Sequence, residues 1–366
     1  MSRLAERLWA WRDRWVANPG FQRWAMRLPF TRPIARHRAR RLFELATATV
    51  TSQVLAAVVE LDLPRRLAAG PVAPDDLASA LDLDPDALRC LVVAAEGLGL
   101  VRGLADGRVA LGMTGAELLA HPGVPAMVRH HRLLARDLAE PVAFLRRPPG
   151  GGELARFWVY AGGRPEGDVA PYSELMAVSQ PLVAEQALAA YPFARHRQLL
   201  DVGGGDGAFV AAVAARHPRL GCTLFDLPPV VARARSRLAP AVGDRIRVVG
   251  GDFRVDPLPP GADLVTLVRI LHDHEDAVAA ALLGKVRRAL VPGGRVLVVE
   301  PMAGTRGAGA VAAYFSFYLR AMGSGRPRTK AELARMLREA GFVRVREHAV
   351  PLPLIARVLS AISPRV

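Results

Sequence analysis

The sequence is poor in cysteine, in acidic residues and in long apolar runs. Its two cysteines, Cys90 and Cys222, lie in apolar or strand-like contexts, so we expect no disulfide framework and a reducing, cytoplasmic environment. No stretch reaches the roughly 18 uninterrupted apolar residues that a membrane span requires. Arg3, Glu6 and Arg7 precede any apolar run, unlike the start of a secretory signal. We therefore expect the chain not to cross a membrane.

The shortage of acidic residues gives the 366-residue chain a formal net charge of +15. About half of this charge lies in residues 1–45, where eleven arginines and three acidic residues leave a net +8. Such an excess indicates a polyanionic partner, either nucleic acid or an anionic lipid surface, or else a solvated basic arm. The length provides for one large domain or two moderate ones.

Residues 1–41 are predicted to form a basic, amphipathic N-terminal arm. Residues 2–17 carry an apolar stripe at helical spacing, with arginines beside it and acidic residues opposite: Leu4, Leu8, Trp11 and Trp15, then Arg7, Arg12 and Arg14, then Glu6 and Asp13. This arrangement is typical of a helix that lies on anionic lipid, here the inner face of the membrane. A stripe that packs on the protein or on a second subunit has the same pattern, so both interpretations stay open.

Residues 42–195 are predicted to form a helical region for dimerisation and for lining a substrate pocket. Residues 42–61 have the pattern of a long apolar helix, buried in a subunit interface or in the core. Residues 74–112 combine two short helices with a hairpin, which is the winged-helix pattern. The second helix, between Asp84 and Leu98, carries a net charge of −2, which would repel phosphate. We therefore expect a homodimer and no nucleic-acid partner.

Residues 196–350 alternate strands and helices, which predicts a doubly wound α/β domain. The first strand, residues 199–202, leads into a glycine turn (Gly203, Gly204, Gly205 and Gly207) that opens a helix. Such a turn lets the backbone approach a bound molecule, and the spacing Gly203-x-Gly205-x-x-Ala208 also fits a dinucleotide site. Residues 351–366 are apolar with prolines and are predicted as a tail without an assigned role.

Acidic side chains close the strands that follow the glycine turn. In chain order they are Asp226, Asp252, the run Leu271-His272-Asp273, and Glu300. Because the carboxyl ends of parallel strands meet at one edge of a sheet, this series suits a nucleoside with a ribose diol, an adenine and a reactive group. No metal site is predicted, since the adjacent His130 and His131 point in different directions on a helix.

Together these motifs resemble those of the S-adenosylmethionine-dependent O-methyltransferases of the plant caffeic-acid and hydroxyindole type. The motifs are the glycine turn, Phe225-Asp226-Leu227-Pro228, Gly251-Asp252-Phe253, Leu271-His272-Asp273, Pro292-Gly293-Gly294 and Glu300. The resemblance implies an α/β fold, with a Rossmann-like, doubly wound catalytic domain that binds S-adenosylmethionine. A mainly helical dimerisation domain that contains a winged helix precedes it. The resemblance extends from about residue 18 to residue 350.

A narrower set of segments is similar to the hydroxyneurosporene (demethylspheroidene) O-methyltransferases of purple bacteria, which methylate a carotenoid alcohol. The segments are Met127–Leu134, Pro171–Met176 with Glu185-Gln186, and Tyr314–Tyr318. This resemblance implies a hydrophobic, hydroxylated substrate, namely a hydroxycarotenoid. The same chemistry on an aromatic polyketide or another phenolic metabolite is the alternative.

The predicted cofactor-binding residues are Gly203, Gly205, Asp226, Asp252, Phe253 and Arg269. Asp226 is expected to accept both ribose hydroxyls. Asp252 is expected to accept from the adenine amino group, with Phe253 packing on the ring. Taken singly, either aspartate could equally cap a helix or stabilise a turn.

His272 is the predicted general base, with Glu300 and Asp273 as its catalytic partners. A carboxylate on one ring nitrogen fixes the tautomer and makes the other nitrogen a stronger base. The plant relatives place a second acid beside the histidine, before an Arg-Thr dipeptide, where this chain has Pro327. That side of the imidazole is therefore expected either to be bare or to be oriented by another group, such as Asp273.

Two other protein classes share parts of this pattern. A winged-helix regulator with a ligand domain is disfavoured by the acidic second helix. A nicotinamide dehydrogenase has no clear use for Asp252-Phe253 or for the pair His272 and Glu300. The sequence thus favours an O-methyltransferase that acts on a hydrophobic substrate.

Overall fold

The computed structural model, which describes residues 3–158, 170–242 and 245–365, divides into two compact units. The units are residues 1–120 and residues 121–366. The division falls inside the predicted dimerisation and substrate-lining region, residues 42–195. The helices from residue 121 onward therefore share a unit with the sheet that follows them.

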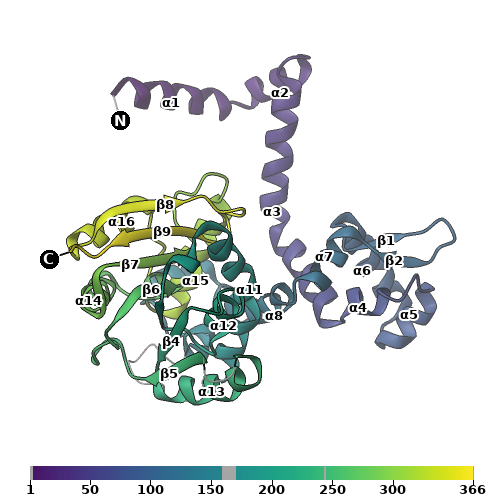
Figure 1. Ribbon diagram of the computed structural model, residues 1–366. Helices are drawn as coiled ribbons and strands as arrows, with labels where there is room; N and C mark the ends of the chain where they lie inside the picture. Colours follow the sequence, from purple (N-terminus) through teal and green to yellow (C-terminus); the bar gives the residue numbers. More distant parts are fainter. Residues whose placement is uncertain (1–2, 159–169, 243–244, 366) are drawn as a thin grey trace. The chain divides into compact units, whose positions relative to one another are not determined.

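The first unit is mainly helical (Figure 1). Its elements are α1 (Arg3–Val16), α2 (Pro19–Arg27), α3 (Arg32–Glu60), α4 (Leu63–Leu67), α5 (Pro74–Leu81), α6 (Pro85–Gly97), β1 (Val101–Gly103), β2 (Val109–Leu111) and α7 (Met113–Ala120). The predicted order of two short helices and a hairpin over 74–112 is present as α5, α6, β1 and β2. Asp84 caps α6 by accepting from the backbone N–H groups of Asp86 and Ala87.

Helix α3 differs from its sequence prediction. Val58 and Val59 are its buried residues, whereas Leu42, Phe43 and Val50 are 69%, 69% and 64% exposed, so the core of its own unit does not bury this helix as predicted. Within the described residues, α3 is also the one helix long and apolar enough, by length and composition, to cross a membrane. Polar residues interrupt its apolar run, which is why a search for uninterrupted runs passes over it. An apolar helix of this kind equally suits a subunit interface.

The second unit carries the sheet and its covering helices. Its helices are α8 (Gly123–Asp137), α9 (Pro141–Arg146), α10 (Glu153–Phe157), α11 (Ala170–Ala190), α12 (Ala208–Arg216), α13 (Pro228–Val242), α14 (Asp276–Ala289), α15 (Gly309–Met322) and α16 (Lys330–Glu339), with 3-10 turns η1 (Phe193–Arg195) and η3 (Leu271–Asp273). Its strands are β3 (Gln198–Val202), β4 (Gly221–Asp226), β5 (Ile246–Gly250), β6 (Ala262–Val268), β7 (Leu290–Glu300), β8 (Val343–His348) and β9 (Arg357–Ile362).

The strand order of the sheet is β5-β4-β3-β6-β7-β9-β8. Strands β3 to β7 are parallel, and β8 and β9 add an antiparallel edge. The order reverses between the neighbours β3 and β6, so their carboxyl ends flank the crevice where doubly wound sheets bind ligands. The predicted doubly wound α/β fold is confirmed.

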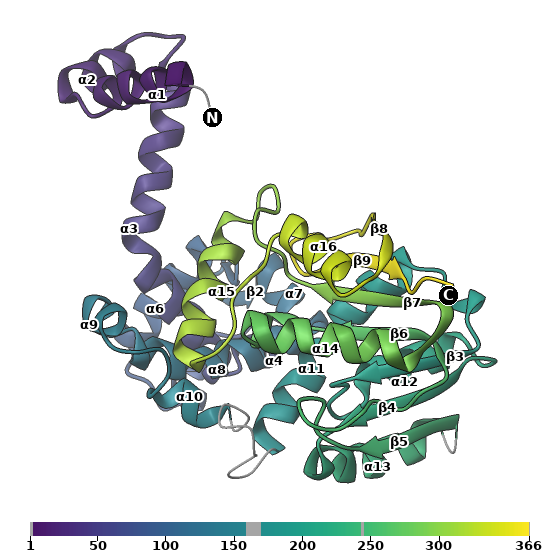
Figure 2. The same cartoon turned by 90° about the vertical axis from the view of Figure 1, so that its left-hand side faces the viewer.

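Helices cover both faces of this sheet, and Figure 2 shows α14 along one of them. One hydrophobic cluster joins α11, α12 and α13 to the sheet through residues such as Val183, Phe209 and Leu238. A second joins α14 and α16 to the opposite face through residues such as Leu283 and Leu337. Strand β6 is buried along almost its whole length, as expected of a strand with helices on both faces of its sheet.

The C-terminal segment is part of the sheet rather than a tail. Residues 357–362 form β9, which pairs with β7 on one side and with β8 on the other. Its residues Val358, Leu359 and Ala361 are fully buried. The sheet therefore extends beyond residue 350, the predicted end of the domain.

Candidate active site

One cavity of about 210 Å³ lies at the carboxyl ends of β3, β4 and β6. It contains a polar part, formed by the glycine turn with Asp206, Asp226 and Asp252, and an aromatic part. His272 and Asp273 also line it. The structure thus brings the predicted nucleoside-binding residues and the predicted base into a single cavity.

The glycine turn has the geometry that the sequence predicts. Gly203 and Gly205 adopt φ values of +71° and +58°, in the left-handed region where side chains are strained. A Cβ on Gly203 would lie 2.4 Å from the Ile270 side chain. A Cβ on Gly205 would meet no atom within 4 Å, and both glycines line the cavity. Helix α12 begins directly after the turn.

Asp226 joins the glycine turn to the end of β4. Its Oδ2 accepts from the Gly205 N–H at 2.7 Å and its Oδ1 accepts from the Leu227 N–H at 2.7 Å. Burial raises the pKa of Asp226 to about 6, although these hydrogen bonds oppose the rise. The carboxylate is thus ionised at neutral pH and fixed in orientation at the cavity wall.

Asp252 and Phe253 line the cavity on the β5 side. Asp252 Oδ1 accepts from the Arg254 backbone N–H at 2.8 Å and from Arg254 Nε at 3.2 Å. The Phe253 ring lies 5.2 Å from the ring of His274. Both residues are placed where the sequence predicts, beside the carboxylate of Asp226.

His272 lies in turn η3, and carboxylates lie near both of its ring nitrogens. Asp273 Oδ1 is 3.0 Å from His272 Nε2, which is the second of the two arrangements left open by the proline at position 327. Glu300 Oε2 is 3.9 Å from Nδ1. Burial alone would lower the pKa of His272, but the charges of Asp273 and Glu300 outweigh it, and the pKa lies above the ordinary histidine value.

Glu300 bonds mainly to the backbone that carries His272. Its Oε1 accepts from the N–H groups of Leu271 and His272, whereas 3.9 Å to the ring exceeds hydrogen-bond length. Burial raises the pKa of Glu300, partly offset by the charges of His272 and Arg328. The predicted hydrogen bond, in which the ring would donate to Glu300, is therefore absent, and Glu300 holds the backbone of the turn while its charge acts on the ring from 3.9 Å.

Arg269 lines the cavity but directs its guanidinium to α11. It donates to Ser179 Oγ at 2.9 Å and to the Met176 carbonyl at 3.2 Å. Its φ of +57° is an uncommon value for a residue with a side chain. Arg269 therefore fixes the wall that carries Met176, and its predicted contact with the cofactor stays a prediction.

The aromatic part of the cavity is lined by Met127, Trp158, Tyr172, Met176, Phe315, Tyr314 and Tyr318. The Phe315 ring lies 5.6 Å from the ring of His272, so this part adjoins the predicted base. The hydroxyl of Tyr318 bonds to His130 Nε2 and that of Tyr314 to His131 Nε2, both at 2.9 Å. Burial lowers the pKa of His130 to about 4 and also lowers the pKa of His131, which favours the neutral rings that bond to the two tyrosines. The described residues contain no group of three or more potential metal ligands.

Two further residues of the site escape the sequence interpretation. Asp206 lines the cavity and pairs with Arg233 at 3.4 Å and Arg237 at 3.0 Å. The two arginines lie four residues apart on α13, and this spacing is the sequence signal that could have predicted a shared acidic partner. The other residue, Arg328, is fully buried behind turn η3.

These residues suit a nucleoside cofactor with a positively charged centre. The glycine turn lines the cavity without side chains, and at Gly205 a Cβ would enter open space; Asp226 presents a carboxylate and Phe253 an aromatic ring. The carboxylate of Asp273 also lies at the cavity wall. This donor set fits S-adenosylmethionine.

Comparisons with known proteins agree on one family. A family model described as an O-methyltransferase domain matches residues 146–343. The chain is 44% identical to demethylspheroidene O-methyltransferase of Cereibacter sphaeroides, covering 100% of this chain and 96% of that protein. It is 42% identical to the protein of the same name from Rhodobacter capsulatus, covering 92% and 85%. The crystal structure of CalO1, a methyltransferase in calicheamicin biosynthesis in its SAH-bound form, is similar with a TM-score of 0.72 and 29% identity, covering 90% of this chain and 98% of that chain.

Proposed function

The chain belongs to the family of S-adenosylmethionine-dependent O-methyltransferases, and we propose that its acceptor is the hydroxyl group of a hydroxycarotenoid of the demethylspheroidene type. The observation that carries this proposal is one cavity whose lining combines the glycine turn and its aspartates, aromatic side chains, and His272, whose ring lies 5.6 Å from that of Phe315. The aromatic part suits an apolar polyene better than a polar acceptor. The identity of 44% over the whole chain to a demethylspheroidene O-methyltransferase supports the same substrate class.

The residues of the chain contribute alignment and proton removal. When bound, S-adenosylmethionine supplies an electrophilic methyl group on a sulfonium. The glycine turn and Asp226 fix the cofactor, and the aromatic part of the cavity aligns the acceptor oxygen for in-line attack. His272 takes the hydroxyl proton, and the nearby carboxylates of Asp273 and Glu300 stabilise the imidazolium that forms. Because an aliphatic alcohol is a weak acid, the proton must leave during transfer rather than before it.

Methyl transfer from labelled S-adenosylmethionine tests the proposed substrate. The purified chain is expected to label a hydroxycarotenoid such as demethylspheroidene, and to leave the corresponding carotenoid without a hydroxyl unlabelled. A phenolic polyketide and a small phenol serve as competing acceptors. Label on phenols alone would keep the methyl-transfer chemistry and overturn the carotenoid assignment.

The N-terminal helices suit two further partners. In α1 the residues Leu4, Trp11 and Trp15 are 68%, 57% and 48% exposed, beside arginines. We propose that this face lies on the anionic inner surface of the membrane, where the apolar substrate resides, and that the chain is cytoplasmic. We propose that a second copy of the chain covers the exposed apolar residues of α3, which makes the enzyme a homodimer.

Deleting residues 1–17 is expected to weaken binding to phosphatidylglycerol vesicles by at least about tenfold, because it removes both the arginines and the indoles. A matched control replaces Glu6 with Gln and Asp13 with Asn, which removes charge of the opposite sign and should strengthen binding. Co-sedimentation with vesicles at low and high salt measures both. The mass of one intact chain is 39.3 kDa. In solution the deletion variant and the charge variant should both sediment as dimers, at twice the mass of one chain, because the proposed subunit face is on α3. Unchanged vesicle binding after the deletion would show that the stripe packs on protein.

A further inference from the structure

A fully buried arginine lies directly behind the turn that carries His272. The side chain of Arg328 has 0% exposure, and it heads the fully buried side chains of the described residues by volume. A buried guanidinium is costly unless its N–H groups are bonded. The hydrogen-bond partners of Arg328 therefore indicate which part of the structure the buried guanidinium stabilises.

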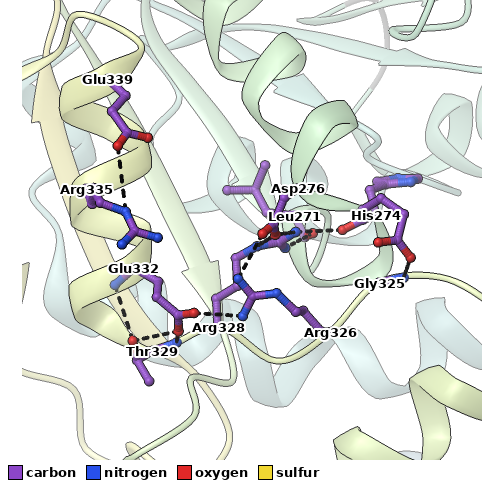
Figure 3. Close-up of polar contacts among 11 residues, drawn as sticks. Leu271, His274, Asp276, Gly325, Arg326, Arg328, Thr329, Glu332, Arg335 and Glu339 are labelled. Carbon is purple, nitrogen blue, oxygen red and sulfur yellow. Dashed lines mark hydrogen bonds and ion pairs between the residues drawn. The ribbon is translucent and has the colours of Figure 1, made fainter.

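Those partners are the backbone of the His272 turn and the start of the next helix (Figure 3). Arg328 Nη1 donates to the Leu271 carbonyl and Nη2 donates to the His274 carbonyl at 2.7 Å. Both Nε and Nη2 donate to Asp276 Oδ1, at 2.9 and 2.7 Å. The two carbonyls flank His272 and Asp273 in the chain, so one planar group fixes both ends of the turn.

The backbone of Arg328 is itself anchored. Its carbonyl accepts from the Ala303 N–H at 2.9 Å, just beyond the end of β7 that carries Glu300. The next residue, Thr329, caps α16 in a capping box with Glu332. The backbone of Arg328 is thus held between the segment after β7 and the start of α16.

Turn η3 is consequently held from two sides by opposite charges. Glu300 accepts from the N–H groups of Leu271 and His272, while Arg328 donates to the carbonyls of Leu271 and His274. Position 327 is proline, which offers the imidazole no carboxylate. The orientation of the ring in this chain therefore depends on the backbone of its turn and on Asp273.

We propose that Arg328 is a positioning residue of methyl transfer, which acts through the two carbonyls to place the His272 imidazole against the acceptor hydroxyl. This inference rests on the proposed role of His272 as the base. A shift of about 1 Å in a reacting group can cost about 100-fold in rate, so such a residue has a large effect without touching substrate.

The test compares two arginines that share Asp276. Arg326 also donates to Asp276, at 3.0 Å, but its side chain is 40% exposed and pairs otherwise with Glu332. In the full-length protein, Arg328→Met is expected to lower kcat per S-adenosylhomocysteine-binding site by about 100-fold, with the Kd for that ligand within about twofold. Arg326→Met should change both by less than about twofold. Arg328→Lys, which keeps a charge and some donors, should recover at least about tenfold of the loss.

The pH profile of kcat separates positioning from a merely structural role. The groups that face His272 are Asp273, Glu300, Arg269 and His274. A loosened turn moves the ring away from both carboxylates, so the acid limb of the Arg328→Lys profile should move to lower pH. A structural role would instead reduce the number of binding sites and the Tm, with kcat per site and the acid limb unchanged.

Fewer binding sites and a lower Tm, with kcat per site and the acid limb unchanged, would overturn the proposal. This result is sought in Arg328→Met, or in Arg328→Lys if Arg328→Met does not fold. The proposed base is tested separately: if His272→Ala keeps the wild-type kcat, the role of His272 fails whatever Arg328 does.

Discussion

Replacing His272 with alanine is expected to lower kcat by about 1,000-fold, because a positioned general base contributes about 100- to 10,000-fold. The substitution removes the group that takes the proton of a weakly acidic alcohol. It leaves the glycine turn and Asp226 untouched, so the Kd for S-adenosylhomocysteine should stay within about twofold of the wild-type value. Single-turnover methyl transfer with saturating cofactor measures the chemical step directly.

The pH dependence of the same step provides a second reading of this prediction. His272 must be unprotonated to accept a proton, and the net effect of its surroundings is a raised pKa. Activity should therefore rise with pH through a value above the ordinary 6.5 of histidine. In Asp273→Asn one of the charges that raises this pKa is gone, so the acid limb should move to lower pH.

Two variants make the result interpretable. His217→Ala removes a ring that stacks on Phe193, 5.9 Å away, and that does not line the cavity, so its kcat should stay close to wild type. If His272→Ala retains kcat, or if Asp273→Asn leaves the acid limb in place, another group accepts the proton and the assignment of the base is wrong.

The parts of the fold that follow from local pattern were predictable from the sequence. Strands β3 and β4 are short and mostly apolar, and their ends are marked by a glycine turn and by an acid, at Gly203 and Asp226. The glycine turn restricts its own backbone through positive φ values, so its shape needs no distant contact. These features placed the cavity and most of its predicted residues.

The parts that depend on distant packing were not predictable. Residues 357–362 were predicted as a tail because the pairing of β9 with β7 is set by contacts far apart in the sequence. Helix α3 shows the converse, since its apolar composition does not reveal that most of it stays exposed within one chain. In the site, Glu300 was expected to bond to the His272 ring, yet the backbone N–H groups of η3 compete successfully for its carboxylate. Arg328 was noted only as part of the Arg-Thr dipeptide after Pro327, and its contacts were not predictable because its partners lie 52 to 57 residues away.

Replacing Asp226 with alanine is expected to weaken S-adenosylhomocysteine binding by about 100-fold, since hydrogen bonds to a charged group contribute about 1.5–3 kcal/mol each. The wild-type carboxylate has two functions that the variant loses together. It is the predicted acceptor for the ribose hydroxyls, and it already accepts from the Gly205 and Leu227 N–H groups. Asp226→Asn keeps one acceptor oxygen and should lose less affinity, which separates the charge from the support of the turn. Isothermal titration with S-adenosylhomocysteine measures both variants.

The raised pKa of Asp226 extends this prediction to pH. Because the pKa of Asp226 is raised to about 6, wild-type affinity should fall as the pH drops below about 6, where the carboxyl gains a proton and can no longer accept from both hydroxyls. Asp226→Asn carries no titrating group there, so its weaker affinity should not show this fall. At saturating cofactor the variant should still approach the wild-type kcat, because His272 and its carboxylates are intact. A loss of kcat at saturation, with the Kd unchanged, would mean that Asp226 serves the chemical step rather than the cofactor.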